Sequence, residues 1–176
     1  MNPPLSIERH LPGHDTAVVD ELAEILVDCV DGGASVSFMQ PLSRARARAF
    51  WQGVLDSAAR AERIVLLARD GDARIAGTVQ VVTALPENQP HRADVAKLLV
   101  HRRARRRGLA RALMLAAEEA ARDAGRTLLV LDTVTGGAAE GLYTQLGWCL
   151  SGRIPGYALM PDGEPCSTTI FYKTLD

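Results

Sequence analysis

The feature that most constrains the fold is a strand, a basic loop, a helix and a second strand within residues 93–132. Residues 93–100 are mainly apolar, and residues 127–132 form the nearly continuous apolar run of a doubly buried parallel strand. Over residues 109–124 apolar side chains recur every three or four positions, which indicates a helix with one buried face, and Glu118 falls off that face. Two parallel strands joined by a helix form a right-handed βαβ unit. This pattern predicts the α/β class.

Further periodic segments supply the rest of one mixed sheet. Helices are predicted at residues 15–30, 43–60 and 138–146, and strands at residues 5–10, 64–69, 75–82, 149–154 and 168–175. Residues 2–4 are expected to be disordered. Repeats, low-complexity tracts and interdomain linkers are not evident. Residues 1–176 are therefore predicted to form one domain, with six to seven strands and helices on both faces of the sheet.

Composition and charge argue against several classes of protein. A net charge of −1 disfavours a dedicated nucleic-acid binder. No apolar run approaches the ~18 residues that span a bilayer, and residues 1–10 lack the basic and apolar regions of a secretory signal. The cysteines Cys29, Cys149 and Cys166 are far apart, without metal-ligand spacing. We therefore expect a cytoplasmic protein with no metal, no nucleic-acid partner and no membrane partner.

The basic loop and the helix that follows it, HRRARRRGLARALM at residues 101–114, predict an anion site. The unpaired N–H groups and positive dipole of a helix N-terminus suit a pyrophosphate. Gly108 allows close backbone approach, and Ala110 keeps the next turn low. The candidate anion-binding residues are Arg105, Arg106, Arg107, Gly108, Leu109, Ala110 and Arg111. Gly-Lys-Ser/Thr and Gly-x-Gly-x-x-Gly are absent, which excludes a P-loop and a Rossmann fingerprint. The alternative is a solvated loop before a surface helix.

Two motifs carry a resemblance to a family. Arg105-x-x-Gly108-x-Ala110 resembles the acetyl-CoA pyrophosphate motif of GNAT (GCN5-related N-acetyltransferase) enzymes, and residues 139–148 resemble their second signature, a helix with a tyrosine near the cofactor sulfur. The resemblance implies a single GNAT domain that binds acetyl-CoA between two splayed parallel strands, ending here near Val100 and Asp132. It also implies a homodimer. The remaining cofactor-binding candidates on these strands are Leu98, Leu99, Val100 and Thr133, with strand backbone pairing to the pantetheine arm.

A narrower resemblance is to bacterial tabtoxin-resistance acetyltransferases. It rests on residues 32–36, 38–39, 92–95, 97–98, 131–133, 155–157, 161–163 and 173–175. It implies an acceptor amine on a small amino-acid-like molecule, such as tabtoxinine-β-lactam. Low charge and this resemblance make Ser35, Phe38 and Tyr157 the candidate acceptor pocket. Another amine (a polyamine, an aminoglycoside or a protein N-terminus) and a non-catalytic acetyl-CoA-binding module are the alternative functions.

Two acidic residues are the implied proton acceptors, because acetyl transfer needs a neutral amine. Asp132 ends an apolar strand at the edge where open α/β sheets bind ligands, although it could instead accept hydrogen bonds from the following turn. Asp94 lies nominally on the same strand face as Leu98. The tabtoxin-resistance enzymes that this chain resembles carry a glutamate at that position, which is one methylene longer than Asp94. Asp94 could therefore act directly, through a water, or only as a salt-bridged acid.

Tyr143 is the implied proton donor to the departing thiolate, and the alternative is a core aromatic residue. A strand N–H near Leu99 or Val100 would stabilise the oxyanion. One position departs from the family pattern: many GNAT enzymes carry an asparagine seven residues before the tyrosine, where this chain has Gly136. Thr133, Thr135 or a water would have to replace its contact.

Overall fold

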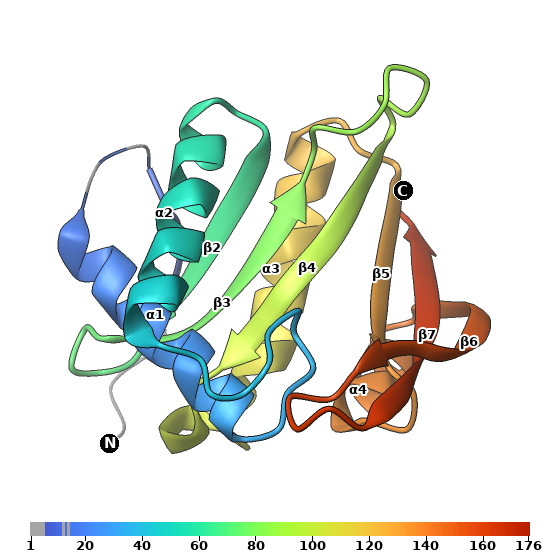
Figure 1. The fold of residues 1–176 in the computed structure, drawn as a ribbon. Helices are drawn as coiled ribbons and strands as arrows, with labels where there is room; N and C mark the ends of the chain where they lie inside the picture. The colour runs from blue at the N-terminus through green and yellow to red at the C-terminus, as the bar shows by residue number, and fades with distance from the viewer. Residues whose placement is uncertain (1–5, 12, 14) are drawn as a thin grey trace.

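The computed structural model of the protein describes residues 6–11, 13 and 15–176. The predicted disorder of residues 2–4 and the predicted strand position Leu5 lie outside the described residues. The elements in chain order are β1 (Ser6–Arg9), α1 (Thr16–Asp31), α2 (Arg44–Ala59), β2 (Arg63–Arg69), β3 (Ile75–Val82), β4 (Arg92–Val100), a 3₁₀ turn (Arg102–Ala104), α3 (Leu109–Asp123), β5 (Leu128–Val134), α4 (Ala138–Gln145), β6 (Cys149–Leu159) and β7 (Pro165–Thr174) (Figure 1). Caps explain two helix starts: the Asp15 side chain accepts from Ala17 N, and the Ser43 side chain from Arg46 N.

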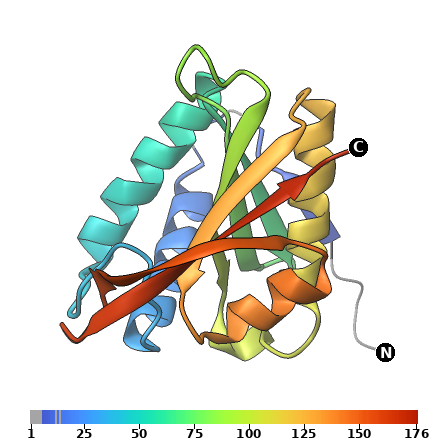
Figure 2. The same ribbon diagram turned by 90° about the vertical axis from the view of Figure 1, so that its right-hand side faces the viewer.

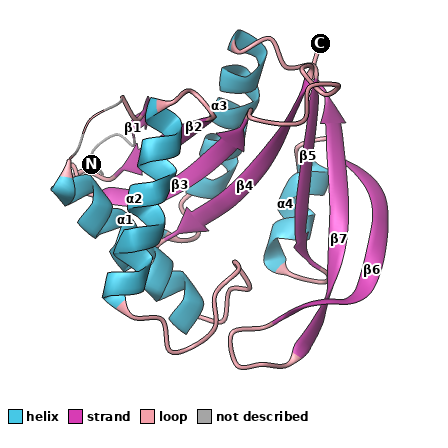
Figure 3. Ribbon diagram, turned by 45° about the horizontal axis from the view of Figure 1, so that its top comes forward, coloured by secondary structure: helices cyan, strands magenta, loops and turns pink. Residues whose placement is uncertain are grey.

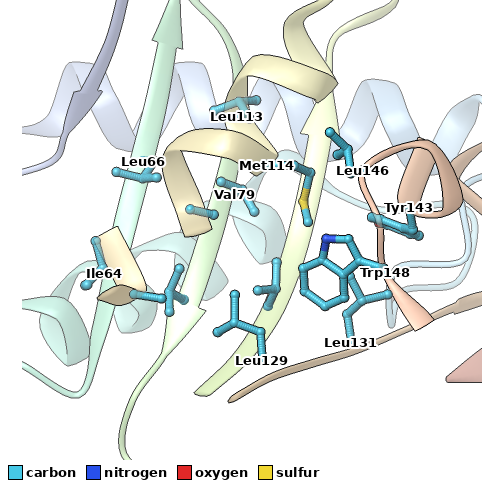
Figure 4. Close-up of a cluster of buried hydrophobic side chains, with 14 of the residues drawn as sticks. Ile64, Leu66, Val79, Leu113, Met114, Leu129, Leu131, Tyr143, Leu146 and Trp148 are labelled. Atoms are coloured by element: carbon cyan, nitrogen blue, oxygen red, sulfur yellow. The ribbon is translucent and has the colours of Figure 1, made fainter. Parts of the chain in front are cut away.

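The described strands form one seven-stranded sheet in the order β1-β2-β3-β4-β5-β7-β6. Among the described strands, only β4 and β5 pair in parallel, as the βαβ pattern predicted. Helices α1 and α2 cover one face of the sheet, and α3 and α4 cover the other (Figures 2 and 3). Each face has its own apolar core. Trp51, on the buried face of α2, belongs to the core under α1 and α2, and Trp148 belongs to the core under α3 and α4 (Figure 4). The predicted α/β fold, with helices on both faces of a mixed sheet, is confirmed.

Strands β4 and β5 separate after a short paired segment. Their pairing covers only Arg92 to Asp94 against Leu128 to Val130. Beyond these residues the two strands diverge toward the bottom of Figure 1. Each strand stays paired on its other side, β4 with β3 and β5 with β7. The divergence therefore opens a gap in the middle of a continuous sheet.

A β-bulge in β4 reverses the order of its side chains. Thr78 of β3 pairs with Leu99 and Gln80 with Ala96, so one residue of β3 opposes two residues of β4. Val95 belongs to the core under α3, and Leu98 packs against that same core three positions later. Asp94 alternates with Val95 and lies on the opposite face. The prediction that Asp94 and Leu98 share a face is therefore wrong, because it assumed a strand without a bulge.

Two further differences have local causes. Glu118 was expected off the buried face of its helix, yet it is only 3 % exposed. It accepts hydrogen bonds from Trp148 Nε1 at 3.0 Å and Lys173 Nζ at 2.7 Å, partners distant in sequence that satisfy a buried carboxylate. Strand β6 runs five residues beyond its predicted end at Ile154, because an irregular register after Ile154 lets it pair again with β7.

Candidate active site

A cavity of about 1060 Å³ lies where β4 and β5 diverge. Its walls come from the loop after α1, the end of β4, the start of α3, β5, α4 and the β6–β7 hairpin. Its lining is more apolar than polar, and its size is at the upper end of ordinary small-molecule sites. The gap in the sheet is thus an accessible pocket large enough for more than one ligand.

The start of α3 forms one end of the cavity. Gly108 is the N-cap, with φ at +80°, and no side chain caps the helix. The first helical hydrogen bond runs from Ala112 N to Gly108 O, so the N–H groups of Leu109, Ala110 and Arg111 precede the helical ladder. All of these residues except Ala112 line the cavity. The predicted anion site therefore faces the cavity through unpaired backbone donors.

The arginines of the basic loop differ in their positions. Arg105 and Arg106 line the cavity, whereas Arg107 is exposed and lies outside the lining. Arg105 Nε donates to Val100 O at 3.1 Å, which ties the loop to the end of β4. Positive charge therefore surrounds the helix end, supplied by Arg105, Arg106 and Arg111.

The diverging edges of the two strands form the middle of the cavity. Leu99 and Val100 pair with Thr78 and Gly77 of β3 on one side, and no strand pairs with them on the β5 side. Leu98, Leu99 and Val100 all line the cavity. On the opposite wall, Thr133 also lines it. An elongated ligand can therefore take hydrogen bonds from the edge of β4.

Tyr143 lies beside this gap, on the buried face of α4. The residue is 6 % exposed, and its ring packs against Trp148 and Phe171, with centroid separations of 6.1 and 5.7 Å (Figure 4). It nevertheless belongs to the cavity lining. Burial, with a smaller contribution from the Asp132 charge, raises the pKa of Tyr143 to about 12. The phenol therefore stays protonated at neutral pH and can act as a hydrogen-bond or proton donor.

The two predicted acids lie differently with respect to the cavity. Asp132 lines it, and its Oδ2 accepts from Thr168 Oγ1 at 3.3 Å. Asp94 lies outside the lining and forms a 2.6 Å salt bridge with Arg92. Partial burial raises the pKa of Asp94, an effect that Arg92 opposes and the Asp132 charge reinforces. The geometry therefore gives Asp132 direct access to a ligand, and gives Asp94 at most an indirect one.

Two loops distant in sequence close the end of the cavity opposite α3. Ser35 Oγ donates to Leu159 O at 2.8 Å, and Gln40 N donates to Pro161 O at 2.9 Å. Figures 1 and 2 show the loop after α1 beside the tip of the β6–β7 hairpin. The candidate acceptor residues Ser35, Phe38 and Tyr157 all line this part, and Tyr157 is 57 % exposed. The loop that contains Ser35 and Phe38 and the strand that contains Tyr157 are thus brought together.

The sequence reasoning missed Lys97 and Thr168, which also line the cavity. Lys97 occupies the bulge of β4, with φ at +54°. Two sequence cues pointed to it: residues 97–98 belong to the segments that carry the narrower resemblance, and Lys97 is one of two lysines in the chain, the other being Lys173. Of the two threonines proposed as replacements for the family asparagine, Thr133 lines the cavity, whereas the Thr135 hydroxyl is hydrogen-bonded to that of Thr169 at 2.9 Å.

The sequence model of the acetyltransferase (GNAT) family matches residues 20–148, which covers the βαβ unit, the basic loop and Tyr143. The chain belongs to the GNAT family. This confirms the predicted N-acetyltransferase class. A curated relative in this class, an uncharacterised N-acetyltransferase in the hisH–hisA intergenic region of Azospirillum brasilense, is 35 % identical over 119 residues, or 66 % of this chain and 68 % of the relative.

Solved structures share the GNAT fold over nearly the whole chain. A Salmonella typhimurium protein determined with its cofactor acetyl-CoA has a TM-score of 0.80 at 18 % identity, covering 98 % of this chain and 95 % of that one. A GCN5-related N-acetyltransferase from Kribbella flavida has a TM-score of 0.79 at 20 % identity, covering 97 % and 98 %. At these identities the likeness establishes the fold.

Within residues 6–11, 13 and 15–176, His, Cys, Asp and Glu side chains do not gather into a group of three or more that could hold a metal ion. None of the described helices combines the length and apolar character needed to cross a membrane.

Proposed function

We propose that this GNAT enzyme transfers the acetyl group of acetyl-CoA to the amine of a small amino-acid-like molecule. The observation that carries the proposal is one continuous cavity. It joins the anion-binding end of α3 to a compartment that contains Asp132 and Tyr143. A pyrophosphate-bearing donor and a small acceptor fit such an arrangement, because the reacting groups meet between the two ends.

The residues present fit acetyl-CoA. Gly108 leaves open space where a Cβ would stand, and the N–H groups of Leu109 to Arg111 offer donors for the pyrophosphate. Arg105 and Arg106 add positive charge beside them. The unpaired edge of β4 from Leu98 to Val100 would hold the pantetheine arm. When bound, acetyl-CoA supplies an activated thioester to this site.

The proposed reaction begins with removal of a proton from the acceptor ammonium group. Asp132 is the proposed base, because its carboxylate lines the cavity while Asp94 is outside the lining and paired with Arg92. Asp94 contributes negative charge on the same sheet face or accepts the proton through a water. A free N–H near Leu99 or Val100 would stabilise charge on the carbonyl oxygen. Tyr143 holds a proton at its hydroxyl for the departing thiolate.

The proposed acceptor class rests on the compartment near Ser35, Phe38 and Tyr157. These side chains are aromatic or small, and among the described residues that line the cavity Asp132 is the one acid. A single carboxylate suits one amine better than it suits a polyamine or an aminoglycoside. The narrower resemblance makes tabtoxinine-β-lactam the first acceptor to test. Acetylation of this acceptor would give the enzyme a role in toxin resistance. The homodimer and the cytoplasmic location stay predictions.

The testing experiment measures CoA thiol release by the purified protein with acetyl-CoA, over amino acids, tabtoxinine-β-lactam, polyamines, aminoglycosides and an N-terminal peptide. Products are checked by mass, and acetyl-CoA affinity is measured separately. Turnover concentrated on amino-acid-like amines supports the proposal, and the β-lactam result decides toxin resistance. Turnover confined to another group of amines rejects the acceptor class. Tight acetyl-CoA binding without turnover on any amine would instead favour the non-catalytic module.

A further inference from the structure

The β-bulge of β4 turns the side chain of Lys97 toward the α1 and α2 face of the sheet. Regular alternation would place Lys97 on the same face as Val95, in the core under α3. Instead its Nζ donates to Ser37 Oγ at 3.0 Å and lies 5.9 Å from the centroid of the Phe50 ring. The left-handed backbone at Lys97 is costly for a residue with a Cβ. The fold thus maintains a strained residue whose side chain lines the cavity.

The charge of Lys97 has no anionic partner among the described residues. No carboxylate of that part of the chain lies within 4.0 Å of its Nζ, whereas Lys173 pairs with Glu118 at 2.7 Å. Burial lowers the pKa of Lys97, and the more distant Asp132 charge opposes that shift. A partly buried ammonium group without an anion is energetically unfavourable, and an anionic ligand would relieve that cost.

The charges that line the cavity divide into two groups. The charged lining residues are Lys97, Arg105, Arg106, Arg111 and Asp132. The arginines lie at the start of α3, where they face the proposed pyrophosphate site. One ammonium group and one carboxylate remain for the acceptor. This pair complements a zwitterion, which carries one ammonium group and one carboxylate of its own.

We propose that Lys97 binds the carboxylate of the acceptor, so that the enzyme selects amines that carry a free carboxylate. The inference rests on the proposed function, because it takes Asp132 as the group that receives the acceptor amine. Ser37 and Phe50 hold the Lys97 ammonium group in place before the acceptor arrives. The same positive charge repels polyamines and aminoglycosides, which adds a second element of selectivity.

The first test compares amino acids with their C-terminal amides in wild-type, Lys97→Met and Lys97→Arg proteins. In the wild type the acids should have the higher kcat/KM. Lys97→Met should lower kcat/KM for the acids by about tenfold to a hundredfold, the range of one charge-assisted hydrogen bond, with little change for the amides or in acetyl-CoA affinity. Lys97→Arg should restore part of the preference. An equal loss for acids and amides would indicate a purely structural role and overturn the proposal.

A second test does not depend on turnover. Because Lys97 and Lys173 are the only lysines in the sequence, side-chain labelling of lysine gives two NMR signals, one of them an internal control. With CoA present, titration with N-acetyl amino acids should shift the Lys97 signal to a saturating value. The C-amides of the same compounds should leave the Lys97 signal unshifted, and the Lys173 signal should stay unshifted throughout. If the acids leave the Lys97 signal unmoved, the proposal is wrong. If the signal moves but no amine is acetylated, the proposed function fails and carboxylate binding stands.

Discussion

The hydroxyl of Ser35 donates a 2.8 Å hydrogen bond to the carbonyl oxygen of Leu159, a residue 124 positions later in the chain. The bond joins the loop after α1 to the end of β6, and both segments line the proposed acceptor end of the cavity. A second contact, from Gln40 N to Pro161 O, lies beside it. The shape of the acceptor end therefore depends on two loops that stabilise each other.

Loss of the Ser35 hydroxyl should weaken acceptor binding. Ser35→Ala removes one hydrogen bond of about 1 kcal/mol, so we expect KM for the acceptor to rise roughly fivefold. Acetyl-CoA affinity should stay close to that of the wild type, because the proposed pyrophosphate site lies at the start of α3. Steady-state kinetics and calorimetry measure the two effects. Ser35→Thr keeps the hydroxyl and serves as the control; a loss of acetyl-CoA affinity in Ser35→Ala would contradict the assignment of the two ends.

Gly108→Glu should abolish acetyl-CoA binding. The substitution adds a negative charge beside the proposed pyrophosphate site, at a position whose φ of +80° also disfavours a side chain. Gly125→Ala is a matched control for strain, since Gly125 has φ of +72° at the other end of α3 and open space around it. Its stability should fall by about 1 kcal/mol with cofactor binding intact. Normal acetyl-CoA binding by Gly108→Glu in calorimetry would reject the anion site.

Asp132→Asn should lower turnover far more than Asp94→Asn. A general base contributes roughly 10²- to 10⁴-fold to rate, and only Asp132 has its carboxylate in the cavity lining. Asp94→Asn should cost about tenfold or less, through the lost Arg92 salt bridge and altered charge. The comparison is made by measuring kcat of both variants at saturating substrate concentrations and one fixed pH. A larger loss for Asp94→Asn would exchange the two roles.

Tyr143→Phe should reduce kcat strongly and leave acetyl-CoA affinity nearly unchanged. The substitution removes only the hydroxyl and keeps the ring that packs against Trp148 and Phe171. The expected loss in kcat is about a hundredfold, as for other positioned proton donors. Tyr172→Phe, at an exposed position of β7, is the control and should behave as the wild type. Unchanged kcat in Tyr143→Phe would remove the proton-donor role.

Alkaline pH should destabilise the wild type more than Tyr143→Phe. The folded protein raises the pKa of Tyr143 from 10.0 to about 12, so folding favours the protonated phenol. Below pH 10 both the folded and the unfolded states are protonated and the stabilisation is complete. Between pH 10 and 12 the unfolded state loses its proton first, and up to about 2 to 3 kcal/mol of stability is lost. Urea unfolding of both proteins at neutral pH and near pH 11 measures the difference, and parallel pH dependences would refute it.

Local patterns were sufficient to predict most of the fold and to select the proposed cofactor-binding residues, all of which except Arg107 line one cavity. The helices and strands carry strong apolar periodicity, and the βαβ unit follows from their order. Gly108 and the helix behind it could be recognised because backbone donors at a helix start depend on residues next to one another in the chain. For the same reason the motif containing Tyr143 was visible, since its position on α4 follows from a few consecutive residues.

The tertiary structure alone decided the acceptor end and the buried charges. Glu118 is buried because Trp148 and Lys173 reach it from other elements. Lys97 faces the cavity because pairing with β3 forces an extra residue into β4. The Ser35 to Leu159 contact needs two loops brought together by the whole sheet. Such features depend on pairing between distant residues, which no local periodicity encodes. The sequence by itself therefore determined the family and the motifs proposed to bind the acetyl donor, while the tertiary structure decided what surrounds the proposed acceptor site.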